Sequence, residues 1–553
     1  MKQNNQKEYY LFVVAIILVF YIILSLFSLG NNYAPSTGWT SQEIGNEIFL
    51  DLGEEKELEK LVYYLGNFEK RHFSFQIGHG EPVEWTDLPE INMKQVYQWG
   101  DAPIYAKGRF LKLTTLNQIT EIKELIIKDC QGNEVIPVNR AEYPWLFDEG
   151  WMYPGYGSFW SGTVFDETVF ARTAYEYLHS IRSYEDTHPP LGKLCIAAGI
   201  ACFGMTPFGW RIAGVVAGGL LLVVIWLFSN RVFQNQWISV GVVALISVDF
   251  LHFTESRLGH IDSFLVLFMT GMDYFLYCYY EAMEKGKKRY NWRYLLGSGI
   301  CFGLAASCKW SGLYGGAGAA VIFAAILFSQ YRKKKITLKY IVSTCGACVV
   351  FFILIPIGIY LLSYLPYVGY DETMGFWTRV WDNQVNMYQY HSHVSPYLES
   401  TSRWFQWPMS VIPMRMSAVF FSDKKMEEVI LLGNPAFWWS GIIMVFGCLM
   451  KLMEKFHGKL AFLLVAYAAP ILPWIVISRS SLIYHYYPSV PFLAMLMGSW
   501  AEARGRKGMW CFFGCCIGSL VMLALFYPVI SGLRVSQAYV SHLEWLPTWN
   551  FLP

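Results

Sequence analysis

The sequence predicts a polytopic α-helical membrane protein that carries a β-rich module outside the membrane. Of its 553 residues, 54% are hydrophobic and only 15% are charged, whereas soluble proteins carry about 25% charged residues. Several apolar runs reach the roughly 20 residues that a helix needs to cross a bilayer. A polar stretch after the first run has the short alternating segments that are typical of strands. The net charge of +1, with no basic patch among aromatic residues, gives no indication of a nucleic-acid partner.

Basic loops define the predicted topology, because Lys and Arg accumulate in the cytoplasmic loops of membrane proteins. The basic loops are 285–293, 332–339, 451–459 and 504–507. Placing them and the N-terminus inside the cell gives eleven spans and an outer C-terminus. The spans are 9–29, 209–229, 236–253, 259–281, 294–309, 311–329, 338–363, 433–450, 459–477, 485–503 and 509–530. The run 9–29 is interpreted as an uncleaved first helix, and the shorter run 191–205 as a re-entrant or interfacial helix on the outer side.

This topology divides the chain into seven predicted segments. They are 1–33 (tail and first span), 34–145 (outer β-sandwich), 146–208 (first outer loop with juxtamembrane and re-entrant helices), 209–363 (spans two to seven), 364–432 (second large outer loop), 433–530 (spans eight to eleven) and 531–553 (outer tail).

The segment 34–145 has the features of an antiparallel β-sandwich. The runs 72–77 and 110–114 alternate apolar and polar residues, and Gly, Pro and Asn separate such runs. Short strands at this spacing are typical of sandwiches. The patterns at 78–85, 108–113 and 121–125 resemble discoidin-like (galactose-binding-like) sandwiches, which bind sugars in some proteins and only pack in others.

The adjacent carboxylates Asp166 and Glu167 are the first candidates for chemistry. Apolar residues then recur at helical spacing, which indicates an amphipathic helix lying on the membrane. The two acids fall at its N-terminus, where the helix dipole favours anions. A structural N-cap would explain one acid. We favour a functional pair, because the rigid turn His188-Pro189-Pro190 follows on the same side of the membrane.

Further polar residues stand in the short outer turns, where charge is costly and often functional. Lys309 is a candidate to bind a phosphate at headgroup depth, although it could also extend to the interface without a ligand. Arg479 is a second candidate phosphate ligand, with His485 beside it. Arg257 and Asp262 could form a salt bridge or contact a substrate.

The second outer loop supplies a third group of candidates. His391 and His393 form a His-x-His pattern, but without an acid or third His nearby a metal site is poorly supported. The aromatic stretch that includes Trp407 fits an interfacial belt, and it also fits a surface on which a sugar could stack.

Taken in order, these motifs resemble the protein O-mannosyltransferases, glycosyltransferase family 39 of the GT-C membrane class. The matching pieces are Phe165-Asp166-Glu167, His188-Pro189-Pro190-Leu191-Gly192-Lys193, Ser256-Arg257 with Asp262-Ser263, Lys309-Trp310-Ser311-Gly312-Leu313, Ser395-Pro396 with Trp407-Pro408, Leu432-Gly433-Asn434-Pro435 with Trp438-Trp439, and Tyr484-His485-Tyr486-Tyr487-Pro488 with Pro491-Phe492. Each piece is weak alone, and their shared order over about 165–500 carries the resemblance.

Two features depart from the family. Eukaryotic members carry MIR repeats in the second large loop, whereas this loop is short, as in bacterial relatives. The family also usually lacks a sandwich between its first helix and the Asp-Glu pair. We therefore expect a GT-C protein of the bacterial type, in a plasma membrane, with an inserted module.

The resemblance implies transfer of mannose from polyprenyl-phosphate-mannose to a Ser or Thr hydroxyl of a secreted or membrane protein. Asp166 is then the expected base of an inverting displacement, and Glu167 would hold the acceptor. The departing phosphate needs no general acid, and Lys309, Arg257 and Arg479 are candidates to neutralise it. No cofactor and no metal are expected.

Two alternatives stay open at this point. One is a GT-C transferase whose acceptor is a lipid-linked glycan or a cell-wall polymer. The other is a transporter or flippase, although transporter sites usually lie near the bilayer midplane, whereas the polar residues here gather on one side. The sequence gives no oligomeric state.

Overall fold

The computed structural model describes residues 2–67, 71–80, 82–93, 96–116, 121–286, 291–369, 373–393 and 400–552. The chain folds into two compact units. The helical unit comprises Met1–Leu29, Thr173–Gly199 and Trp210–Pro553, and the sheet unit comprises Gly30–Arg172 and Ile200–Gly209. Glu81 and the Ser395-Pro396 motif lie outside the described residues.

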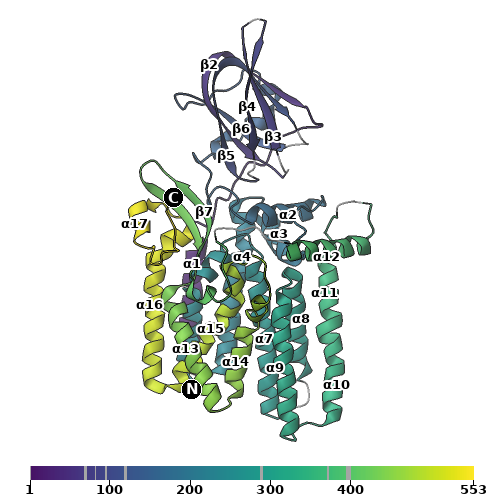
Figure 1. The fold of residues 1–553 in the computed structure, drawn as a ribbon, viewed down its shortest axis with the longest axis vertical. Coiled ribbons are helices and arrows are strands. Elements are labelled where there is room, and N and C mark those ends of the chain that lie inside the picture. Colours follow the sequence, from purple (N-terminus) through teal and green to yellow (C-terminus); the bar gives the residue numbers. More distant parts are fainter. Residues whose placement is uncertain are drawn as a thin grey trace. The chain divides into compact units, whose positions relative to one another are not determined.

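The helical unit is built from long apolar helices that run side by side (Figure 1). They are α1 (Lys2–Leu26), α4 (Pro207–Val232), α5 (Gln236–Ser247), α6 (Phe250–Ser256), α7 (Asp262–Glu284), α8 (Trp292–Cys308), α9 (Gly312–Arg332), α10 (Leu338–Val349), α11 (Ile355–Ser363), α13 (Pro435–Glu454), α14 (Gly458–Ala468), α15 (Val490–Ala503) and α16 (Gly505–Ser531). Each of the eleven predicted segments is at least partly helical. Among the described residues, six helices are long and apolar enough to cross a membrane, or seven if α5 and α6, bent by 58°, form one span. Membrane spans are therefore present, and the count of eleven stays a prediction.

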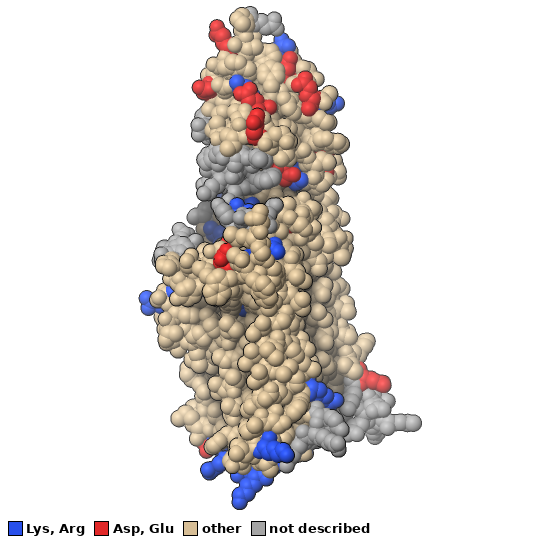
Figure 2. Space-filling model, turned by 90° about the vertical axis from the view of Figure 1, so that its right-hand side faces the viewer, with Lys and Arg blue, Asp and Glu red and all other residues tan. Residues whose placement is uncertain are grey.

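The four basic loops meet at one end of the helical unit, where Lys and Arg gather (Figure 2). Contacts between the loops show this: Lys333 Nζ lies 3.0 Å from Glu284, Lys459 Nζ donates to Val232 O at 3.3 Å, and Gln234 N donates to Glu502 at 3.0 Å. The middle of the unit shows few charged side chains on the face shown in Figure 2. An excess of Lys and Arg at one end of the helices is the pattern expected of cytoplasmic loops.

Shorter helices complete the unit. The run predicted as re-entrant forms α3 (Leu191–Phe203), whose 13 residues are too few to cross a bilayer. Helix α2 (Glu167–His179) precedes it, and both helices continue across the boundary between the units. Helix α12 (Phe376–His393) lies across the end of α11 (Figure 1). A small sheet of β7 (Met414–Phe420), β8 (Lys425–Leu431) and β9 (Val535–Ser536) is followed by α17 (Gln537–Ser541).

The sheet unit contains one antiparallel sheet. Its strands are β1 (Trp39–Thr40), β2 (Glu47–Leu65), β3 (Arg71–His79), β4 (Glu84–Met93), β5 (Trp99–Thr115) and β6 (Glu121–Asp129), in the order β1-β6-β2-β5-β3-β4. The strands predicted at 72–77 and 110–114 are confirmed within β3 and β5. The long strands β2 and β5 pair along most of their length, with two register shifts in β2. The described strands form one hydrogen-bonded sheet, so the discoidin-like sandwich is not confirmed and stays a prediction.

The two ends of the sheet unit's main segment are held together by Glu149. Its carboxylate accepts hydrogen bonds from Ser36 N at 2.7 Å and from Thr37 N at 3.0 Å. The Glu149 backbone N–H donates to buried Glu124 at 2.8 Å, and burial raises the pKa of Glu124 to about 8. A module whose ends lie together fits insertion between two helices of a larger fold.

Arg257 secures the end of α1 and does not line the cavity described below. Its fully buried guanidinium donates to the carbonyls of Ser25 (3.1 Å), Phe27 (3.0 Å) and Ser28 (2.7 Å). The last carbonyls of a helix have no partner within the helix. Arg257, the C-cap residue of α6, donates hydrogen bonds to the carbonyls at this end of α1. This candidate phosphate ligand therefore has a structural role instead.

We predict that Arg257→Gln lowers the apparent melting temperature of the purified protein. Each buried carbonyl left without a donor costs about 1–3 kcal/mol. The matched control is Arg231→Gln, because Arg231 is 37% exposed in its pair with Glu281 and should contribute at most about 1 kcal/mol. Equal melting temperatures for both variants would contradict the assignment.

Candidate functional site

A cavity of about 250 Å³ lies at the ends of α8 and α9 that are remote from the basic loops. Five residues selected from the sequence line it: His188, Lys309, His391, Arg479 and His485. They come from four separate stretches of the chain, all within the helical unit, because Arg479 and His485 share one turn. Aromatic side chains, among them Trp310 and Trp474, complete the walls.

Lys309 is held in this cavity by Asp262. It is the C-cap of α8 with an extended backbone, so its side chain leaves the helix end. Its Nζ lies 3.0 Å from both carboxylate oxygens of Asp262, the first residue of α7, and 4.7 Å from the centre of the Tyr484 ring. Both partners of this ion pair are nearly buried. The predicted salt bridge of Asp262 is thus made with Lys309 and not with Arg257.

Glu185 fixes the position of the His188-Pro189-Pro190 turn. The Glu185 carboxylate lies 2.9 Å from His188 Nδ1 and forms an ion pair with the fully buried Lys193. Lys193 Nζ also donates to the backbone carbonyls of Glu185 and His188, both at 2.9 Å. Burial would raise the pKa of Glu185, but the Lys193 and His188 charges outweigh it and hold this pKa well below its usual range.

Helix α12 is fastened onto this turn and brings His391 to the cavity. Asn383 Nδ2 donates to Asp186 O at 2.7 Å, and His391 Nε2 lies 2.8 Å from Thr187 O. Since a carbonyl only accepts, Nε2 carries the proton, and Nδ1 accepts from Arg479 Nη1 at 3.0 Å. Burial, with His188 and Arg479 nearby, lowers the pKa of His391 to about 4. A neutral His391 therefore orients the Arg479 cation without cancelling its charge.

His485 is enclosed by two indole rings. Its ring centre lies 4.1 Å from that of Trp474, and its ring stacks on Trp407 at 5.9 Å. Trp407 is buried behind His485 and is not part of the cavity lining. The Arg479 guanidinium carbon lies 5.2 Å from the centre of the Trp474 ring. The aromatic stretch predicted for sugar stacking thus supports the cavity wall from behind.

Asp166 and Glu167 belong to the sheet unit. Glu167 is buried, and its carboxylate accepts from Val164 N at 3.0 Å while its own N–H donates to Val164 O at 3.0 Å. The Glu167 side chain therefore bonds back to the backbone three residues before it, as the acid of a capping box does. Asp166 is partly exposed beside it. The catalytic assignment of this pair stays a prediction.

The other His of the His-x-His pattern lies apart from the cavity. His393 is exposed, and its Nδ1 lies 2.9 Å from Gln389 O. Both ring nitrogens of His391 are already paired with protein groups. The alternative of a metal bound by His391 and His393 therefore gains no support from the geometry.

Sequence reasoning missed Glu185 and Trp474, and it quoted Trp310 only as part of the Lys309 motif. Glu185 could have been found, because an acid stands three residues before His188 and eight before Lys193 in one short motif. Trp310 follows Lys309 directly, and its Nε1 donates to Tyr360 OH at 3.1 Å. Trp474 has no comparable signal, because aromatic residues make up 18% of the chain.

The arrangement is suited to binding a phosphate beside a sugar. Lys309 and Arg479 present two cations at one small cavity, and charge-assisted hydrogen bonds to phosphate are strong in a site of low polarity. Lys309 is partly neutralised by Asp262, whereas the partner of Arg479 is a neutral imidazole. The fold and the site thus define a multispanning membrane protein with two cations gathered at a cavity at the end of its helices.

Comparisons with known proteins identify its family. The family model described as "Dolichyl-phosphate-mannose-protein mannosyltransferase" matches residues 187–360. A second model, "C-terminal four TMM region of protein-O-mannosyltransferase", matches residues 376–549. The two models together cover more than half of the chain, and this chain belongs to the protein O-mannosyltransferase family.

Curated relatives and a solved structure agree. The chain is 27% identical over 457 residues to the polyprenol-phosphate-mannose--protein mannosyltransferase of Mycolicibacterium smegmatis, covering 70% of this chain and 87% of that one. The protein of the same name from Mycobacterium tuberculosis is 25% identical over 457 residues, covering 70% and 86%. The S. cerevisiae Pmt1-Pmt2 complex bound to the sugar donor superposes with a TM-score of 0.62 at 14% identity, covering 70% of this chain and 89% of that chain. This last likeness shows the fold alone, and the GT-C membrane fold is therefore confirmed.

We predict that Glu185→Gln strongly destabilises the protein, because it leaves the Lys193 charge buried without a counterion. Breaking a buried ion pair costs about 3–5 kcal/mol. Since the folded pKa of Glu185 is lowered from 4.5, the pair stabilises the fold above about pH 4.5 and this contribution is lost as the pH falls further. The melting temperature of the variant should lose that acid dependence.

The control is the double variant Glu185→Gln/Lys193→Met, which removes both charges together. It should recover part of the lost stability, because replacing a whole buried pair is often nearly neutral. A double variant less stable than Glu185→Gln would contradict the assignment.

Proposed function

We propose that this protein is an enzyme that transfers mannose from polyprenol-phosphate-mannose to proteins. The curated relatives over 70% of the chain carry this activity in their names, and both family models name protein mannosyltransferases. Within the chain, the observation that supports it best is the cavity in which Lys309 and Arg479 meet among aromatic walls. A lipid-linked phosphate with a sugar attached needs cations and flat side chains of this kind.

The finer features of the proposal come from the sequence. The acceptor would be a Ser or Thr hydroxyl of a secreted or membrane protein. The chain would cross a plasma membrane eleven times, with the N-terminus and basic loops in the cytoplasm and the cavity outside. The sheet unit would be an outer discoidin-like module. Neither a metal nor another cofactor forms part of the proposal.

The proposed reaction is a direct displacement at the sugar carbon bonded to phosphate. The acceptor hydroxyl attacks that carbon, the bond to the phosphate oxygen breaks, and the hydroxyl proton passes to Asp166. The lipid phosphate leaves as an anion, which Lys309 and Arg479 stabilise as its charge grows. Asp262 sets the position of Lys309, and His391 sets that of Arg479.

We predict that Asp166→Asn lowers mannosyl transfer by about 10²–10⁴-fold, because it removes the base. The assay follows radiolabelled mannose from polyprenyl-phosphate-mannose into a Ser/Thr-rich peptide or endogenous membrane proteins, with release by β-elimination. The control is Asp87→Asn, an acid of the sheet unit bonded to Gln76, which should keep normal activity. Near-normal transfer by Asp166→Asn would reject the base, and label entering lipid or polymer would reject the protein acceptor.

We predict that Lys309→Met lowers transfer by about 10²–10³-fold, the usual cost of removing one donor that stabilises developing negative charge. Lys309→Arg should recover part of the rate, because it keeps a cation at the cavity. The double variant Lys309→Met/Asp262→Asn avoids a buried unpaired carboxylate, and it should fold normally and remain inactive. An active double variant would show that Lys309 does not serve the phosphate.

A further inference from the structure

A second and larger hollow lies at the opposite end of the helical unit, among the basic loops. Its volume is about 630 Å³, and its walls come from the ends of α4, α7, α13, α14 and α15. Helix α14 separates the two sites: it begins at Gly458 in the hollow and ends at Ala468, shortly before Trp474 of the cavity. The proposed transfer reaction uses no residue of this hollow.

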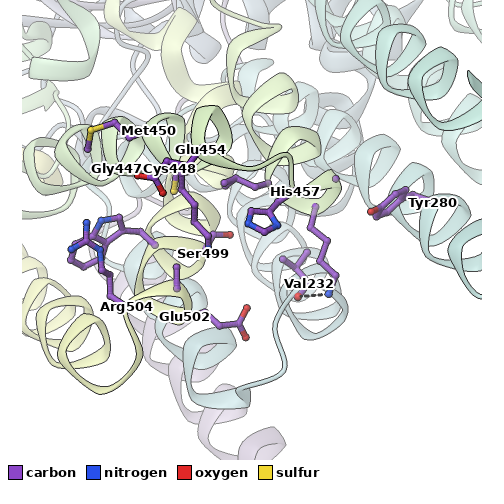
Figure 3. A pocket seen from close by; sticks show the side chains of 16 residues that line it. Val232, Tyr280, Gly447, Cys448, Met450, Glu454, His457, Ser499, Glu502 and Arg504 are labelled. Carbon is purple, nitrogen blue, oxygen red and sulfur yellow. Dashed lines mark hydrogen bonds between the residues drawn. The ribbon is translucent and has the colours of Figure 1, made fainter. Parts of the chain in front are cut away.

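Three cations from two loops line the hollow: Lys451, Lys459 and Arg504. Among the described residues, no carboxylate lies within ion-pairing distance of any of them, in contrast to Lys333 and Lys335 on the neighbouring loop, which both pair with Glu284. The guanidinium carbon of Arg504 lies 5.5 Å from the Trp500 ring, which itself lines the hollow. Figure 3 shows Arg504 at one side of the hollow and Tyr280 at the other, with His457 between them.

The start of α14 adds to the positive character of the hollow. His457 is the N-cap, yet its side chain makes no capping hydrogen bond. The first backbone N–H groups of a helix lack partners within it, and the helix dipole favours an anion at this end. His457, Gly458, Lys459 and Leu460 all line the hollow. The backbone approaches Tyr280 closely here, because a Cβ at Gly458 would lie 2.5 Å from the Tyr280 hydroxyl.

Two acids share the hollow with these cations, and apolar side chains complete its wall. Glu502 accepts a hydrogen bond from Gln234 N at 3.0 Å, and Glu454 is exposed at the end of α13. Met450 and Leu460 supply apolar surface next to these charges. A ligand with a phosphate, a nearby amine and an apolar body would complement the cations, the acids and the apolar side chains of the hollow.

We propose that this hollow binds the phosphate of a glycerophospholipid headgroup from the membrane leaflet at the basic end. The phosphate would lie against Lys451, Arg504 and the start of α14, and the glycerol and acyl chains against the apolar wall. The two acids favour a headgroup that also carries an amine, so phosphatidylethanolamine should bind more tightly than phosphatidylglycerol. The binding needs no mannosyl transfer and stands apart from the proposed function.

The test uses the purified full-length protein in phosphate-free detergent and a phosphatidylethanolamine with a photoreactive acyl chain. After irradiation, labelling is quantified in peptides that contain 447–460 and 499–504. Lys451→Gln/Arg504→Gln should reduce this labelling by about tenfold or more, since each cation near a lipid phosphate is worth about 1 kcal/mol. The charge-preserving variant Lys451→Arg should keep it.

The matched control is Lys333→Gln/Lys335→Gln, which removes the same charge from the same end of the protein. It should change the labelling less than twofold. An equal loss in both double variants would show general surface attraction and overturn the proposal, as would undiminished labelling of Lys451→Gln/Arg504→Gln. If millimolar inorganic phosphate abolished labelling and stabilised the lipid-free protein, the hollow would bind a soluble phosphate instead of a lipid. Unchanged melting temperatures of the lipid-free variants show that folding is not the cause.

Discussion

The buried carboxylate of Glu185 is the centre on which the cavity end of the helical unit depends. It pairs with Lys193 at the start of α3 and with His188 in the proline turn. Because Pro189 and Pro190 restrict the backbone, anchoring this one acid fixes the whole turn. The backbone carbonyls of Asp186 and Thr187 then point at α12 and receive Asn383 and His391. The charge of Glu185 would be costly if it were buried alone. Through its partners it thus connects α3 and α12 next to the cavity.

The two cations of the cavity are held in different ways, and the difference suits their proposed task. Lys309 has a carboxylate partner, which makes burial of its charge tolerable before a donor binds. Arg479 has a neutral imidazole and the face of Trp474, so its charge stays available. A site with two full carboxylate partners would repel a phosphate, and a site with none would be hard to keep folded. One acid for two cations is a compromise between these limits.

The helical unit has two ends of different chemistry. At one end two cations, buried Lys309 and half-buried Arg479, are individually positioned around a small cavity. At the other end they are numerous, largely exposed and gathered in loops, where α14 begins with its N-terminus in a larger hollow. Apolar helices separate the two ends. A ligand bound at one end therefore affects the other end only through the packing of helices such as α14.

The sequence by itself determined the class of fold, the helical segments, two strands of the inserted module and five residues of the cavity. These were readable because hydropathy, alternation and charge in a membrane protein are imposed by the solvent around each segment and need no knowledge of the tertiary contacts. The tertiary structure alone decided the partners. Arg257 and Lys309 look alike in sequence, as cations in outer turns, yet one caps α1 and the other enters the cavity. Which carbonyl or carboxylate lies within reach depends on how distant helix ends pack, and neither composition nor spacing along the chain encodes that distance.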